Sequence, residues 1–76
     1  MPSHDSILKK HSLVISGHHT SVTLENIFWD QFKAIARLRG QSLSLLAAEI
    51  DAQRARDHAE GNLSSALRVF VLKNSI

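Results

Sequence analysis

The segment His19-Thr20-Ser21-Val22-Thr23-Leu24 decides the fold of this chain, because it alternates polar and apolar residues directly before two helical patterns. Successive side chains of a strand point to opposite faces, so Thr20, Val22 and Leu24 share one face and the other three residues share the opposite face. A single strand leaves its backbone N–H and C=O groups unpaired. The segment therefore needs a partner strand, and the identity of that partner governs what the ribbon can do.

The size and composition of the chain favour association of two copies. It has 76 residues, 43% of them hydrophobic, and no cysteine. The hydrophobic content is that of a globular domain. Without disulfides or a thiolate metal site, a core of this size supplies only roughly 3–5 kcal/mol. We therefore expect a homodimer.

The first residues carry clustered positive charge. Nine Lys and Arg residues against seven Asp and Glu give a net charge of +2, and Lys9, Lys10 and His11 gather near the N-terminus. Such a cluster suits a polyanion or a solvated terminus equally. We expect a flexible basic arm at residues 1–11 and a single domain at 12–76. No membrane-spanning run or secretory signal is visible, so we expect a cytoplasmic protein without membrane contact.

A second strand is a candidate at residues 12–16. Gly17-His18 suits the two central positions of a type II′ hairpin turn, where glycine takes the first. In that hairpin Ile15 would face Thr20, and the apolar faces of the two strands would match. Pairing within the chain is therefore an alternative to pairing between two chains.

A first helix is predicted from Asn26 to Arg39. Phe28, Phe32 and Ile35 follow three- and four-residue steps, which is typical of an amphipathic helix. Gly40 suits the position just past the helix end, where a left-handed backbone is common.

Two more helices are expected after this one. Ser42 is a good N-cap for a helix that extends to about Arg56. A loop around Glu60-Gly61-Asn62 then leads to an apolar segment at about 63–72, which Asn62 would cap as a third helix, although its valines also allow a strand. Ser64-Ser65 at its start could hold an anion, but capping explains these residues equally.

The order of these elements resembles the ribbon-helix-helix family. The matching pieces are the strand at 19–24, the helix at 27–38 and the connection Gly40-Gln41-Ser42-Leu43-Ser44, while residues 17–25 and 62–68 resemble a small, mostly uncharacterised bacterial branch. The resemblance implies a mostly α fold with a short β-ribbon, in an intertwined homodimer with a possible extra N-terminal strand and C-terminal helix. The shared dimer core would comprise Val22, Leu24, Phe28, Phe32, Leu46 and Ile50.

The resemblance also implies a dimeric protein that binds double-stranded DNA, and so a transcriptional regulator. Its ribbon would enter the major groove, which is about 12 Å wide. His19, Ser21 and Thr23 would face base edges, although a solvated strand face also explains them. The free N–H groups at the start of the second helix would hold a phosphate. The implied phosphate contacts are Ser42, Leu43, Ser44, Lys9 and Lys10.

A dimeric protein-interaction module on the same scaffold, without DNA recognition, is the second hypothesis. It is motivated by the near-neutral charge, the hydroxyl-rich ribbon and the possible hairpin. Two hairpins joined in one dimer would make four strands, about 14 Å across, which is wider than the groove. Another protein would then be the partner.

Enzyme activity, a cofactor and a metal site are not expected. His18 and His19 are adjacent and point to opposite faces of a strand, so they cannot chelate together. His4, His11 and His58 are scattered, and no nucleophile with a nearby base follows from local spacing.

Overall fold

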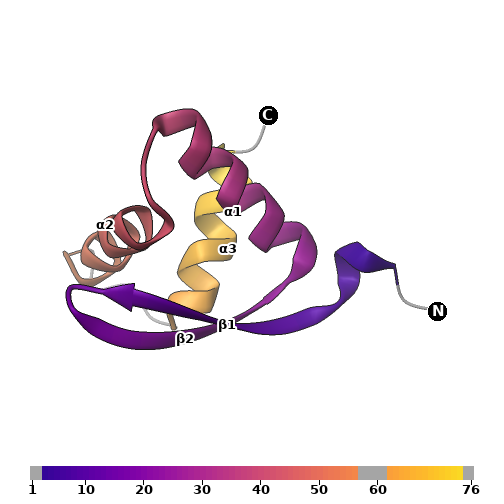
Figure 1. The fold of residues 1–76 in the computed structure, drawn as a ribbon, viewed down its shortest axis with the longest axis horizontal. Coiled ribbons are helices and arrows are strands. Elements are labelled where there is room, and N and C mark those ends of the chain that lie inside the picture. Colours follow the sequence, from indigo (N-terminus) through magenta and orange to yellow (C-terminus); the bar gives the residue numbers. More distant parts are fainter. Residues whose placement is uncertain (1–2, 57–61, 75–76) are drawn as a thin grey trace.

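A computed structural model of the chain describes residues 3–56 and 62–74. The two strands form one antiparallel hairpin, and the three helices lie on one side of it (Figure 1). The predicted mostly α fold with a β-ribbon is confirmed, including the extra strand and the C-terminal helix. Residues 57–61, which contain most of the predicted loop, lie outside the described residues. The elements are η1 (His4–Ser6), β1 (Leu8–Ile15), β2 (His18–Glu25), α1 (Asn26–Arg39), α2 (Leu43–Arg56) and α3 (Leu63–Asn74).

The hairpin turns at Ser16-Gly17, one residue earlier than predicted. Both residues have positive φ, 51° and 81°, as a type I′ turn requires. Ile15 pairs with His18, and Thr20 pairs with Leu13. The predicted type II′ turn and the pairing of Ile15 with Thr20 are therefore wrong. The register differs by two residues, an even shift that leaves every side chain on its predicted face.

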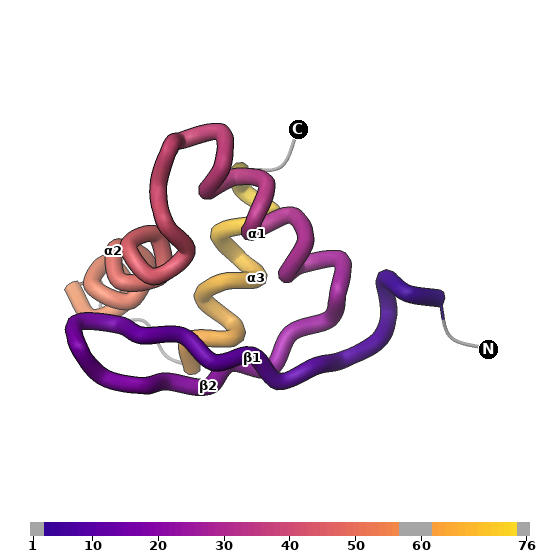
Figure 2. Tube along the Cα trace, viewed as in Figure 1, coloured from indigo at the N-terminus to yellow at the C-terminus, as the bar shows by residue number. Residues whose placement is uncertain are grey.

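Strand β1 starts earlier than the sequence indicated. Residues 8–11, which we placed in a flexible arm, form its first half and pair with residues 22–25. The pairing extends one step further, because the N–H of Asn26 donates to the carbonyl oxygen of Ile7 over 2.8 Å. Figure 2 shows the two strands side by side, with β2 continuing directly into α1.

The first two helices begin and end at the predicted residues. Gly40 has a φ of 66°, and the N–H groups of Gly40 and Gln41 donate to the carbonyls of Arg37 and Ala36, which closes the end of α1. The hydroxyl of Ser42 accepts a hydrogen bond from the N–H of Leu45 over 3.0 Å. The alternative that residues 63–72 form a strand is excluded, because the whole segment is helical.

Asn62 caps the third helix, as predicted. Its side-chain oxygen accepts a hydrogen bond from the N–H of Ser65 over 2.9 Å. Helix α3 therefore starts at the predicted residue and extends two residues beyond the predicted end, to Asn74.

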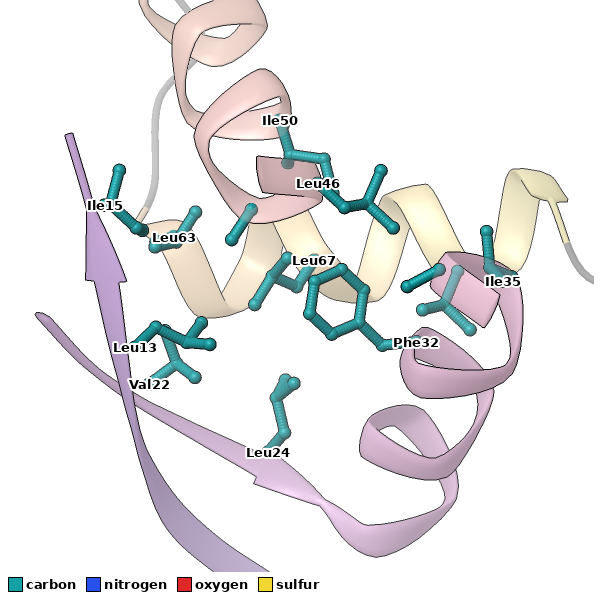
Figure 3. Packing of buried hydrophobic residues seen from close by; sticks show 13 residues of the cluster. Leu13, Ile15, Val22, Leu24, Phe32, Ile35, Leu46, Ile50, Leu63 and Leu67 are labelled. Atoms are coloured by element: carbon teal, nitrogen blue, oxygen red, sulfur yellow. The ribbon is translucent and has the colours of Figure 1, made fainter. Parts of the chain in front are cut away.

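The core lies between the hairpin and the helices, with Phe32 at its centre (Figure 3). The hairpin supplies Leu24, α2 supplies Leu46 and α3 supplies Leu67, and each of these side chains is fully buried. One chain thus encloses its own apolar interior. The residues that we assigned to a shared dimer core all lie in or against this single-chain core: Val22, Leu24, Phe28, Phe32, Leu46 and Ile50.

Candidate nucleic-acid interface

The hairpin has an outward face that none of the three helices covers (Figure 1). The inward face carries the core residues, so the residues between them in the sequence point outward. His19, Ser21 and Thr23, the predicted base-contact residues, form one exposed row on this face. Strand β1 adds a parallel row, in which Lys10 is paired with Thr23 and Ser12 with Ser21. We did not predict this second row, because we expected residues 8–11 to belong to the flexible arm.

Helix α3 contacts the free edge of β2 at Thr23 and Glu25. The backbone N–H of Thr23 donates to the hydroxyl oxygen of Ser64 over 3.1 Å, and Arg68 donates to the Thr23 carbonyl over 3.3 Å. Arg68 also donates to Glu25 over 2.9 Å. The pKa of Glu25 lies below its usual range because its carboxylate accepts a hydrogen bond from the Glu25 backbone N–H and another from the Arg68 guanidinium. Ser64 and Arg68 therefore bind the backbone of the strand edge rather than a free anion.

An open hollow of about 360 Å³ lies beside this contact. Its walls are the outward row of β2 and the start of α3: Ser21, Thr23, Asn62, Leu63, Ser64 and Arg68. The Arg68 charge is already paired with Glu25, so this hollow offers hydroxyl groups more than positive charge.

The start of α2 offers free amides. The N–H groups of Leu43 and Ser44 make no hydrogen bond within the described residues, since the Ser42 hydroxyl caps only Leu45. Such groups attract an anion, and the helix dipole adds to the attraction. Helix α2 lies on the opposite side of the hairpin from the outward face (Figure 1). The fold therefore does not bring the predicted phosphate and base contacts of one chain onto one surface.

The two candidate lysines of the first strand lie on opposite faces of the hairpin. Lys10 belongs to the outward row, whereas Lys9 pairs with Leu24 and points to the helical side, where it is exposed at the strand end. Only Lys10 adds positive charge beside the predicted base-contact row.

His11 is held against a tryptophan and does not contribute charge to the outward face. Its ring stacks on Trp29 with a centroid distance of 3.9 Å and an interplanar angle of 8°. Its Nε2 atom is buried and has no hydrogen-bond partner within the described residues. Burial lowers the pKa of His11. The positive charges of Lys9 and Lys33 lower this pKa further, whereas the negative charge of Asp30 raises it. The neutral imidazole therefore acts as a packing group.

A group of potential metal ligands lies at the N-terminal end of the described chain. Donor atoms of His4, Asp5 and Asp30 lie within 4.8 Å of one another. His4 Nε2 is 3.0 Å from Asp30, and Lys33 is 3.7 Å from the other oxygen of the same carboxylate. The hydrogen bond with His4 is the main cause that lowers the pKa of Asp30, and Lys33 lowers it further. These partners account for the group as a surface ion pair, and the absence of a metal site stays a prediction.

Comparison with known proteins identifies the domain. The model of a family described as "Ribbon-helix-helix domain" matches residues 8–75, a range that begins with β1. Among solved structures, an uncharacterized protein from Bordetella pertussis Tohama I is similar, with a TM-score of 0.76 and 31% sequence identity. The match covers 92% of this chain and 57% of that one, so the chain spans little more than half of that protein. No curated protein matches the chain. None of the described helices is long and apolar enough to cross a membrane.

Proposed function

This chain belongs to the ribbon-helix-helix family, and we propose that it binds double-stranded DNA and regulates transcription. The family generally comprises DNA-binding transcription regulators, and its fold is non-enzymatic. A regulator of this kind acts in the cytoplasm, where the DNA of a bacterium lies.

One observation carries the proposal, namely the exposed outward face of the β1–β2 hairpin. Two strands lie about 4.8 Å apart, and a two-stranded ribbon fits a major groove of about 12 Å. A ribbon built from two chains was the expectation from the family. Here one chain supplies both strands, so a single hairpin has the width that the groove admits.

Base edges would meet the hydroxyl and imidazole groups of this face. Ser21, Thr23 and Ser12 can donate and accept hydrogen bonds, and His19 can do the same through its two ring nitrogens. None of these groups forms the bidentate pairs by which Arg or Asn select one base. We therefore expect modest discrimination among sequences, with Lys10 adding attraction to the phosphate backbone.

The phosphate contacts would flank the groove. The free N–H groups of Leu43 and Ser44, with Ser42 as the cap, offer an anion site in the helical layer, and Lys9 lies on the same side of the hairpin. A phosphate of the DNA backbone that flanks the groove would bind at this site.

A fluorescence-anisotropy titration of labelled random-sequence DNA, at low and at moderate salt, tests the proposal. Binding at low salt that weakens steeply as salt rises is expected, because phosphate contacts release counterions. Selection of preferred sites from a random library then identifies sequences for comparison. Ser21→Ala with Thr23→Ala should reduce the preference for the selected site over random DNA, whereas Ser65→Ala on α3 should leave it unchanged.

One observation favours the protein-interaction module as the alternative: the outward face carries Lys10 as its only residue with a permanent positive charge. Absence of DNA binding even at low salt would reject the regulator and favour the module. Binding with unchanged preference in the double variant would retain DNA binding and reject base readout by these two residues.

A further inference from the structure

The outward face of the hairpin carries an apolar side chain beside the predicted base-contact row, that of Val14. In the sequence Val14 stands between Leu13 and Ile15, which point into the core and are only 5% and 7% exposed. Val14 itself is 42% exposed. None of the described helices lies on this side of the hairpin (Figure 1), so the fold leaves the methyl groups of Val14 partly in water.

The side chains of Val14 and His19 lie close together. The N–H and C=O groups of Thr23 point away from β1, because they bind side chains of α3. Thr23 and its partner Lys10 therefore form a non-hydrogen-bonded pair, and every second pair of the ladder has the same geometry. Val14 and His19 form one of these pairs, in which the Cβ atoms of facing residues are about 5 Å apart. An aliphatic group and an imidazole thus stand side by side on the outward face.

Charge distinguishes the two ends of this face. Leu8 is its other exposed apolar residue and is paired with Glu25, and a carboxylate at this end repels the phosphates of DNA. At the opposite end, the outward neighbours of Val14 are Ser12 and His19, and neither is acidic. The end that carries Val14 is therefore the one that can approach the bases closely.

The major groove presents an apolar group of its own, the C5-methyl group of thymine. An aliphatic side chain that enters the groove gains by contact with this group, because both lose their exposure to water. We propose that Val14 contacts a thymine methyl group and makes the chain prefer a T·A base pair at that position. The proposal rests on the function proposed above, since it requires the hairpin to enter the groove.

The chemistry of Val14 separates thymine from cytosine in two ways. Cytosine lacks the C5-methyl group, so the apolar contact is lost. Cytosine also presents an amino group in the groove, and Val14 offers no acceptor to replace the water that this donor would lose. The hydroxyl groups of the base-contact row can both donate and accept, so they do not discriminate in this way. Val14 therefore adds a selectivity that the polar residues of the face lack.

Deoxyuridine tests the contact, because it differs from thymidine only in the absence of the C5-methyl group. The probe is the duplex with the preferred site from the random-library selection, in which each thymine is replaced in turn by uracil. At the contacted position the parent chain should bind the uracil duplex about fourfold more weakly, since the contribution of one buried methyl group is lost. A uracil outside the bound site should leave the affinity unchanged. This comparison does not depend on the folding of any variant.

Val14→Ser assigns the contact to this residue, because the substitution removes both methyl groups of the side chain. The variant should bind the thymine and uracil duplexes equally well, so the two changes are coupled in a double-mutant cycle. Val69→Ser is the matched control, since Val69 is 50% exposed and lies on α3, away from the outward face. It should retain the fourfold difference. Circular dichroism checks that both variants are folded.

Three results overturn the methyl contact and leave the proposed function intact, because the chain still binds DNA. The first is a preferred site without thymine. The second is equal affinity of the parent for the thymine duplex and every uracil duplex. The third is a Val14→Ser variant that keeps the full fourfold difference, which would assign the contact to another residue. Absence of binding to any duplex at low salt is distinct, since it rejects the proposed function and the methyl contact together.

Discussion

The backbone N–H of Thr23 donates to the hydroxyl of Ser64 across 3.1 Å, which ties β2 to a helix 41 positions later in the chain. Arg68 satisfies the carbonyl of the same residue, so both outward-directed groups of Thr23 have side-chain partners from α3. A strand edge without partners would expose these groups to water or to another chain. The contact therefore satisfies the edge of β2 at Thr23 and joins this strand to α3.

Loss of the Ser64 hydroxyl should destabilise the fold. Ser64→Ala leaves the Thr23 N–H without its partner, and we expect the free energy of unfolding to fall by about 1 kcal/mol, the typical net contribution of one hydrogen bond. Urea denaturation followed by circular dichroism measures the change. Ser65→Ala is the control, because Ser65 is exposed and its hydroxyl has no hydrogen bond within the described residues. Equal stability of the two variants would contradict this role.

The type I′ turn should respond in opposite directions to two substitutions. Gly17 has a φ of 81°, so Gly17→Ala forces a side chain into a left-handed backbone and should cost about 1–2 kcal/mol. Ser16 also has a positive φ, 51°, and Ser16→Asn introduces the residue favoured at the first position of this turn. It should raise the midpoint of thermal unfolding slightly. A lower midpoint for Ser16→Asn would argue against the type I′ turn.

The stability of the chain should depend on pH through His11. Its pKa lies below the ordinary value of 6.5, so the folded state favours the neutral ring. The associated stability is present at pH values above 6.5 and decreases as the pH falls from there towards the lower pKa of the folded state. His11→Phe keeps an aromatic ring against Trp29 without a titrating group. Urea denaturation from about pH 7.5 to about pH 5 should show a shallower loss for the variant than for the parent. Parallel curves would show that His11 contributes nothing to the pH dependence.

The salt dependence of DNA binding should fall when Lys10 loses its charge. Lys10→Gln removes one charge from the outward face and should reduce the slope of log affinity for DNA against log salt by about 0.9. Lys73→Gln, at the far end of α3, should leave that slope unchanged. Anisotropy titrations at several salt concentrations measure the slope, and an equal slope for Lys10→Gln and the parent would contradict a phosphate contact by Lys10.

The helix boundaries could be predicted from the sequence because their signals are local. Gly40, Ser42 and Asn62 each stand at a helix end whose backbone they complete, and each takes the predicted position in the structure. The row of His19, Ser21 and Thr23 could likewise be predicted, since the two-residue period of a strand depends only on neighbouring residues.

The extent of β1 and the partners of Thr23 depend on contacts between segments that are distant in the sequence. Residues 8–11 look like a solvated arm in isolation and become a strand because residues 22–25 supply their hydrogen bonds. Ser64 and Arg68 look like a helix start with an anion site and instead bind the backbone of Thr23 in β2. These pairings join residues far apart in sequence, and no local pattern records them. Local sequence patterns were therefore enough to predict the helices and the outward face, whereas the first half of β1 and the contact of Thr23 with α3 depend on segments that meet only in the folded chain.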